Sequence, residues 1–271
     1  MANRLRYTYA VVRPSSALEH VLSDVRGVAN ASVALVRSTT VAAAVSSVPE
    51  EEFSEQALKD RLEDLDWLET VARAHHSVVE VLSAHTTVLP LRLATLYADD
   101  AHVREMLGER RQTFTALLDR LADHVEWGVK IYTEPSNETA PSEPPVGGDL
   151  SAQSRPGRAY LQRRSDQRRA REDVWRAAEE MIRRIDAEAR DLAVEHARHR
   201  LQQGRLAGGP GENVANDAYL VPRHLAEEFR DRVLRSTEGL PGLRVEVTGP
   251  WAPYSFAEPA APDTREGAPP Q

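Results

Sequence analysis

The stretch Val88-Leu89-Pro90-Leu91-Arg92-Leu93-Ala94-Thr95-Leu96-Tyr97 places one cation and one proline among apolar residues. Pro90 fixes its own φ and disfavours helix at the residue before it, so we expect a preceding helix to end and the chain to run extended past a core. A guanidinium drawn into that core would need carboxylate or carbonyl partners. We favour the alternative, in which the stem of Arg92 lies on apolar surface and its head stays in water.

The residues before this stretch predict a split sheet. Residues 5–12 are rich in β-branched and aromatic side chains, and Pro14-Ser15-Ser16 then offers a break and an N-cap for a helix to about Val25. Two apolar runs, 31–36 and 41–48, are separated by a short polar link that suits an antiparallel hairpin. The β-α-β-β order indicates a ferredoxin-like split α+β sheet with helices on one face.

Helices are predicted on both sides of the opening stretch. Residues 50–64 are acidic and helical in composition, and another helix is expected from the acidic pair Asp99-Asp100 to about Leu121. Between them, apolar residues step by three or four positions and predict a helix whose inner face holds Leu65, Leu68, Ala72, His76, Val79 and Leu82. His76 and Glu80 could both ligate a metal ion, but no third ligand has a matching spacing, so we predict no metal site.

A break in composition divides the chain into two predicted domains. Residues 134–151 combine turn formers and acids with scarcely any apolar anchor, which predicts a mobile loop or linker. We therefore expect an N-terminal α+β domain over residues 1–124 and a C-terminal α+β domain over 125–256. The mobile loop would span 134–153, and residues 257–271 would form a disordered tail.

The second domain is expected to contain a long helix. Residues 155–204 are dominated by good helix formers, and their apolar positions form a heptad-like seam, as in a coiled coil, that we expect to pack within the chain. The seam consists of Trp175, Ala178, Ile182, Ile185, Ala189, Leu192, His196 and His199. With strands at 126–133, 217–222 and 243–248 and a helix at 224–238, the predicted order is β-α-β-α-β.

Composition narrows the class of protein. The chain has 271 residues, enough for two ordinary domains, and its 41% hydrophobic and 28% charged residues are typical of a soluble globular protein. The absence of cysteine excludes disulfides and thiolate chemistry and is typical of a reducing cytoplasm. No run is apolar for long enough to span a bilayer, and residues 1–4 lead into the first strand without a signal-peptide core. A net charge of −8 disfavours general binding to nucleic acid.

Catalytic motifs are not found. No nucleophile is paired with a base, and no carboxylate pair, metal-ligand set or phosphate loop has a discriminating spacing. The cluster Gly208-Gly209-Pro210-Gly211 lacks the Lys-Ser/Thr of a phosphate loop and follows a helix, so it predicts a plain turn. The sequence therefore predicts a protein that is not an enzyme and that uses no cofactor or metal.

The predicted long helix begins with a cluster of cations, an arrangement that opposes the helix macrodipole. Its members are Arg155, Arg158, Arg163, Arg164, Arg168, Arg169 and Arg171, with Asp166 as the one acid among them. Three interpretations stay open: a solvated face paired with acids elsewhere, a contact for an acidic protein partner, and an RNA site. Because Tyr160 is the only stacking residue there, we favour the protein partner over RNA.

Several segments, taken together, resemble the gas vesicle protein L/F family. They occur in the order of that family and span most of the chain: His76, the opening stretch around Arg92, Glu126-Trp127-Gly128-Val129-Lys130, Gly157-Arg158-Ala159-Tyr160-Leu161, and Gly249-Pro250-Trp251-Ala252-Pro253-Tyr254-Ser255-Phe256. The chain departs from the family pattern at one place, because the pattern has Phe-Gly after the arginine and this chain has Leu93-Ala94.

The resemblance implies a non-enzymatic, two-domain protein that is needed to build gas-filled protein shells in the cytoplasm. Members of the family are held to contact the small hydrophobic major shell subunit and other accessory proteins. This implies an assembly factor or minor shell-associated protein located at the gas vesicle or in the cytoplasm, which would cover aggregation-prone strands until they join the shell. The candidate contact residues are Arg92, Trp127, Arg158, Tyr160, Arg163, Arg164, Trp251, Tyr254 and Phe256.

Two interpretations from other classes stay open. A small-molecule-binding α+β module would be stabilised against heat by its ligand. An RNA-binding protein that uses the basic start of the long helix would bind with a steep dependence on salt. The sequence also leaves open the oligomeric state and whether the protein remains in the finished vesicle.

Overall fold

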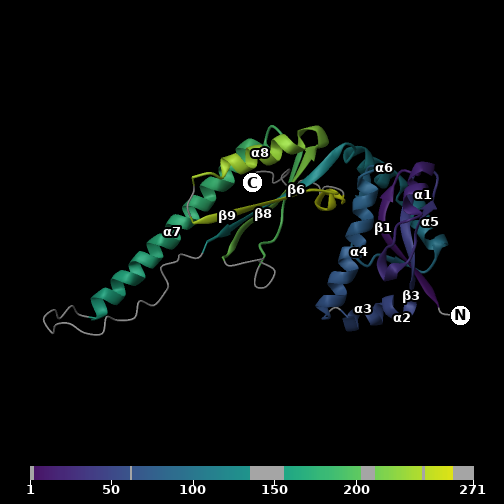
Figure 1. The fold of residues 1–271 in the computed structure, drawn as a ribbon, viewed down its shortest axis with the longest axis horizontal. Coiled ribbons are helices and arrows are strands. Elements are labelled where there is room, and N and C mark those ends of the chain that lie inside the picture. Colours follow the sequence, from purple (N-terminus) through teal and green to yellow (C-terminus); the bar gives the residue numbers. More distant parts are fainter. Residues whose placement is uncertain (1–2, 62, 135–155, 203–210, 240–241, 259–271) are drawn as a thin grey trace, which may run out of the picture. The chain divides into compact units, whose positions relative to one another are not determined.

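The computed structural model describes residues 3–61, 63–134, 156–202, 211–239 and 242–258 (Figure 1). At 156–163, 166–167 and 170–171 only the helical backbone is described. The predicted mobile loop at 134–153, apart from Glu134, and the predicted tail beyond residue 258 lie outside the described residues.

The chain divides into two compact units. The first unit comprises Met1–Glu126 together with Pro250–Gln271, and the second comprises Trp127–Gly249. The first boundary lies close to the expected one after residue 124. The second boundary differs from the expected one. Residues 250–256, which we call the C-terminal aromatic segment, were expected in the second domain but pack with the first unit. Its Ala252 is part of the first hydrophobic core.

The first unit is built on a five-stranded sheet in the order β2-β3-β1-β4, with β5 also paired to β1. Its strands are β1 (Arg4–Val12), β2 (Val33–Arg37), β3 (Ala42–Pro49), β4 (Val88–Pro90) and β5 (Leu96–Tyr97). The described strand pairs of this sheet are antiparallel, and β1 lies between β3 and β4. The structure thereby confirms the ferredoxin-like split β-α-β-β arrangement, and the opening stretch provides the outer strand β4 as a buried, extended connection.

The helices of the first unit are α1 (Ser16–Leu22), α2 (Glu50–Phe53), α3 (Glu55–Arg61), α4 (Leu65–Ser83), α5 (Asp100–Glu109) and α6 (Arg111–Arg120). The single helix expected from Asp99 to Leu121 is wrong, because Arg110 (φ −99°, ψ 15°) interrupts it. Asp99 nevertheless caps α5 as the acidic pair predicted, accepting from the backbone N–H of Ala101 and His102.

The inner face of α4 agrees with the prediction at Val79 and Leu82, but in the preceding turns Val71 and His75 are buried in place of Ala72 and His76. Val71, His75, Val78, Val79 and Leu82 are buried, whereas Leu65 is 66% exposed. Two overlapping apolar stripes exist in this sequence, and the rings of Tyr7 and Tyr9 on β1 select the stripe that contains His75. Periodicity alone could not choose between them.

The second unit repeats the topology of the first. Its elements are β6 (His124–Thr133), α7 (Pro156–Ala189), β7 (Glu195–Arg198), β8 (Asn213–Pro222), α8 (Ala226–Ser236) and β9 (Leu243–Trp251). The sheet order β7-β8-β6-β9 matches β2-β3-β1-β4 position by position. Helices α7 and α8 pack against each other and against β8. Both units are therefore β-α-β-β-α-β folds with the same strand order.

Helix α7 ends earlier than predicted, and its seam is shorter. Among the described side chains of α7, Ala178, Met181, Ile185 and Ala189 are buried, while residues 195–198 form the unpredicted strand β7. Strand β7 pairs with β8, and Val194 N–H donates to the carbonyl of Leu220 at 2.8 Å. Pairing with β8 thus overrides the helix propensity of this segment. No helix in the described part of the chain is both long and apolar enough to cross a bilayer.

Candidate functional site

The C-terminal aromatic segment forms an anchored surface on helix α4 of the first unit. The Trp251 ring is 39% exposed and lies 5.2 Å from the ring of His76, edge to face. Tyr254 also stacks against His76, with ring centroids 6.2 Å apart. Ala252 and Phe256 are buried, so the segment presents Trp251 outward while its other apolar residues point into the unit.

Hydrogen bonds hold this segment in place. The carboxylate of Glu126, which is only 8% exposed, accepts from the backbone N–H of Ser255 at 2.8 Å and from its hydroxyl at 2.6 Å. Arg120 donates to the carbonyl of Phe256 at 2.6 Å. Hydrogen bonds to charged groups are stronger than neutral ones. The presentation of Trp251 is therefore fixed by contacts along the whole segment and does not depend on one packing contact.

A polar and aromatic cluster lies beneath the segment. The Tyr7 hydroxyl and Nδ1 of His75 share a hydrogen bond of 3.1 Å, and the backbone N–H of Ala94 donates to the same hydroxyl at 3.1 Å. Burial lowers the pKa of His75 to about 4, with a smaller contribution from the charge of His76, so the imidazole is neutral at pH 7. Burial also raises the pKa of Tyr7 and of Tyr254, which keeps both phenols protonated.

Arg92 stays outside the core, as the sequence predicted. Its side chain is 83% exposed and forms an ion pair with Glu258, which is also exposed. Two residues later, Ala94 adopts a left-handed backbone with φ 58°. This is the position at which the family pattern has glycine, so the departure from that pattern falls on a residue whose backbone conformation favours glycine.

The remaining candidate residues lie in different environments. Trp127 is 4% exposed and packs in the second unit against Phe229, with ring centroids 6.3 Å apart. Arg164 is exposed on α7. Arg158, Tyr160 and Arg163 also belong to α7, but their side chains lie outside the described residues. The structure thus brings together Trp251, Tyr254 and Phe256, and does not bring Trp127 to a surface.

A cluster in the second unit was missed by sequence reasoning. Asp217, which is 6% exposed, accepts from Nε2 of His196 at 3.0 Å and from Nε of Arg198 at 3.3 Å. The His196 ring stacks on Tyr219 with centroids 4.7 Å apart, and the Tyr219 hydroxyl donates to Asp186 at 3.1 Å. Because His196 and Arg198 were assigned to a helix, their spacing of two residues, which is the signal of a strand face, was not used.

This cluster borders a shallow hollow of about 330 Å³. The hollow is lined by Asp186, Ala189, Arg190, Ala193, Val194, Glu195, His196 and Tyr219. Burial, reinforced by the charge of Asp186, raises the pKa of Tyr219, so its phenol is no general base at neutral pH. The arrangement can bind a small polar group but pairs no nucleophile with a base.

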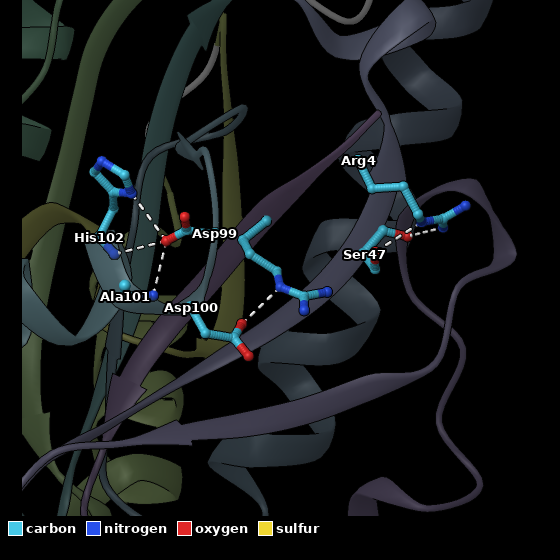
Figure 2. A network of polar contacts seen from close by, with 7 residues as sticks. Arg4, Ser47, Asp99, Asp100, Ala101 and His102 are labelled. Carbon is cyan, nitrogen blue, oxygen red and sulfur yellow. Dashed lines mark hydrogen bonds and ion pairs between the residues drawn. The ribbon is translucent and has the colours of Figure 1, made fainter. Parts of the chain in front are cut away.

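A third polar network lies at the start of β1 in the first unit (Figure 2). Nε of Arg4 donates to the Ser47 hydroxyl of β3 at 2.7 Å, and Nε of Arg6 donates to Asp100 at 2.6 Å. Asp99 accepts from the backbone and ring of His102, which lowers the pKa of Asp99 and raises that of His102. The network ties α5 to the sheet, and each of its charges has a partner.

A metal centre is not formed in the described part of the chain, where no three His, Asp or Glu side chains converge on one point. What the described residues offer is therefore an anchored aromatic surface, an exposed basic helix and a shallow polar hollow, all of which suit binding.

Comparison with known proteins gives consistent matches over the whole chain. The family described as gas vesicle synthesis protein GvpL/GvpF matches residues 5–258. Gas vesicle protein L of Streptomyces sp. (strain CB03234) is 43% identical over 265 residues, covering 97% of this chain and 97% of that protein. Gas vesicle protein F of the same strain is 28% identical, covering 80% of this chain and 84% of its own length.

Solved structures show the same fold. The crystal structure of the gas vesicle protein GvpF from Anabaena sp. PCC7120 superposes with a TM-score of 0.65 at 19% identity, covering 95% of this chain and 98% of that one. The GvpF structure from Microcystis aeruginosa gives a TM-score of 0.62 at 18% identity, covering 94% and 99%. The two-domain α+β arrangement is shared by these proteins.

Proposed function

The chain belongs to the gas vesicle synthesis protein GvpL/GvpF family, which gives it a role in gas vesicle formation, and we propose that it fills this role as a non-enzymatic assembly factor or minor shell-associated protein. In this proposal it binds the hydrophobic major shell subunit and other accessory proteins without covalent chemistry. A subunit with aggregation-prone apolar strands needs its surface covered until it is incorporated into the shell.

One observation carries the proposal: the family match at residues 5–258 includes both units and the C-terminal aromatic segment. A match to one unit alone would have suggested a module reused in another setting. The matched region includes Trp251, an aromatic side chain that is held rigidly and left partly exposed. Rigid aromatic anchors contribute strongly to protein interfaces because little side-chain entropy is lost on binding.

We assign the contact with the apolar shell subunit to the surface formed by Trp251 and His76. Phe256 and Glu126, which are buried, and Tyr254, which is half-buried, would support this surface from within. Arg92, with its exposed side chain, would lie at the polar rim of a contact, where charges steer association more than they add affinity.

We assign contacts with acidic accessory proteins to the basic start of α7. Arg164, Arg168 and Arg169 are exposed there, and Arg168 has a local partner in Glu172, at 2.9 Å. Arg158, Tyr160 and Arg163 belong to the same stretch of helix. Such a contact depends on salt, because exposed charges are screened over about 8 Å at physiological ionic strength.

A pull-down of the tagged full chain from cells that express a complete gas vesicle gene cluster tests the contact assigned to Trp251 and His76. We expect the major shell subunit to be recovered, and Trp251→Ala to reduce its recovery at least several-fold. Trp175→Ala is a matched control, because Trp175 is equally exposed at 39% but lies on α7 of the second unit. Equal recovery with both variants, or recovery of nucleic acid alone, would contradict the proposal.

The second candidate function, a small-molecule-binding module, is favoured by the hollow beside His196 and Tyr219. Its charged lining suits a small polar metabolite. A metabolite extract that raises the melting temperature of the wild-type chain, but not that of His196→Ala, would support this candidate. An unchanged melting temperature of the wild-type chain in the presence of the extract would exclude this candidate function.

A further inference from the structure

Strand β9 offers the longest outer edge of the two sheets. The sheet order places β9 at the end of the second sheet, and no strand among the described residues pairs with its outer side. Strand β9 has nine residues, whereas the other end strands β2, β4 and β7 have five, three and four. Natural proteins usually shorten or block such edges, because unpaired peptide groups are a template for another strand.

Three contacts fix the register of β9 against β6. Glu134 N–H donates to the carbonyl of Gly242 at 2.8 Å, and the Arg244 guanidinium lies 4.3 Å from the centre of the Tyr132 ring. A Cβ added to Gly128 would lie 2.8 Å from the Thr248 hydroxyl. These contacts describe one antiparallel register without a bulge, in which 134, 132 and 128 face 242, 244 and 248.

This register decides which peptide groups point outward. In an antiparallel ladder the N–H and C=O of alternate residues point to the same neighbour. Because the Gly242 carbonyl points to β6, the peptide groups of Arg244, Glu246 and Thr248 do so as well. Those of Leu243, Val245 and Val247 therefore point away from the sheet, at the outer edge.

The charges on β9 are complementary to a second copy of the same strand. Arg244 and Glu246 share one face and lie 3.5 Å apart. If two β9 strands pair antiparallel with Val245 opposite Val245, each Arg244 directly faces the Glu246 of the other copy. A shift of two residues in either direction would instead place Arg244 opposite Arg244 or Glu246 opposite Glu246, which is unfavourable.

We propose that two copies of this chain associate edge to edge through β9, antiparallel and centred on Val245. The outward peptide groups of Leu243, Val245 and Val247 would then form about six main-chain hydrogen bonds across the twofold axis. Arg244 is positioned by its contact with the Tyr132 ring and lies on the same strand face as Glu246. A single strand pair buries little area, so the dimer is weak and reversible.

Sedimentation equilibrium of the full chain, from about 1 µM to about 1 mM, measures this association. We expect a monomer–dimer equilibrium for the wild type. Arg244→Glu and Glu246→Arg should each be monomeric alone, because each places like charges opposite one another. An equimolar mixture of the two variants should dimerise, and the double variant should recover self-association, because both arrangements restore opposite charges.

Two further variants serve as controls. Val245→Pro removes an outward N–H without touching the β6 ladder, so it should abolish the dimer with little change in melting temperature. Arg232→Glu reverses a paired charge on α8, away from the edge, and should leave the dimer unchanged. A wild type that stays monomeric throughout the range, or a dimer that persists in Val245→Pro, would overturn the proposal.

Discussion

The two units share one topology and one strand order, yet they use it differently. In the first unit the helix after the first strand, α1, has 7 residues, and the outer strand β4 has 3. In the second unit the corresponding elements, α7 and β9, have 34 and 9 residues. The first unit therefore keeps its connections short around a core, whereas the second extends the same elements into surfaces that partners can reach.

Backbone strain separates the units as well. Among the described residues, the first unit places four residues with a side chain in the left-handed region, namely Ala29, Asn30, Ala94 and Asp123. In the second unit the positive-φ positions are glycines: Gly211, Gly239, Gly242 and Gly249. A Cβ in this region costs about 1–2 kcal/mol per residue. The first unit therefore holds side chains at strained positions, whereas the described part of the second unit has glycine at each of its positive-φ positions.

The largest effect is expected from a substitution in the hydrophobic core of the second unit. Phe229 is fully buried between Trp127 and Tyr219, so Phe229→Ala should lower the free energy of unfolding of this unit by about 3–5 kcal/mol. Amide hydrogen exchange should show loss of protection within residues 127–249, while the strands β1 and β3 stay protected. Equal loss in both units would mean that they share one cooperative core.

A pH titration probes the first core. The pKa of His75 is about 4 in the folded chain and 6.5 in the unfolded one. The contribution of the neutral imidazole to the free energy of unfolding is therefore complete above pH 6.5 and is lost as the pH falls towards 4. The loss should reach about 3 kcal/mol, at 1.36 kcal/mol for each unit of pKa difference. His75→Phe should remove this pH dependence from the free energy of unfolding of the first unit, which denaturant unfolding measures at each pH.

The matched control for that titration is Val78→Ala, on the same buried face of α4. It creates a cavity and should lower stability by a similar amount at every pH, leaving the slope unchanged. A slope that survives in His75→Phe would assign the pH dependence to other groups.

A smaller effect is expected where the C-terminal segment is attached. Glu126→Gln replaces a carboxylate that accepts two hydrogen bonds from Ser255 by an amide that accepts fewer and weaker ones, at about 2 kcal/mol. We expect faster exchange of the Ser255 amide and altered Trp251 fluorescence. Glu51→Gln, at an exposed position, should change neither. An unchanged Ser255 amide in Glu126→Gln would show that ring packing alone holds the segment.

The smallest effect is expected from relieving the backbone strain at Ala94. Ala94→Gly should stabilise the first unit by about 1 kcal/mol, because glycine adopts φ 58° without a Cβ clash and the gain exceeds its larger unfolded-state entropy. The converse change, Gly242→Ala at φ 77°, should destabilise the second unit by a similar amount. Thermal unfolding measures both. If both substitutions stabilised their units, or both destabilised them, the difference in backbone strain between Ala94 and Gly242 would be contradicted.

Much of the fold could be predicted from local patterns. The β-branched and aromatic content of residues 5–12 and the apolar runs 31–36 and 41–48 predicted the split sheet, and Asp99 predicted a helix start. Strand composition and helix capping are both encoded within a few neighbouring residues. Strand β7 could not be predicted in this way. Its four residues have helix-forming character, and only pairing with β8 makes them extended.

The candidate site could be predicted only in part. The exposure of Arg92 followed from composition, since a guanidinium among leucines prefers water. The role of the C-terminal aromatic segment as a contact surface stays a prediction. Which aromatics face outward did not follow. Trp127 and Phe256 are buried and Trp251 is not, because that choice depends on Phe229, Glu126 and Arg120, which are distant in sequence.

Site-specific photocrosslinking in cells that make gas vesicles tests the central claim most directly. A photoreactive amino acid replaces Trp251 in one strain and Trp175 in another, and crosslinked chains are identified by mass spectrometry. We predict that position 251 crosslinks to the major shell subunit and that position 175 does not. Absence of the shell subunit at position 251, while vesicles still form, would contradict the proposal that this anchored aromatic surface binds it.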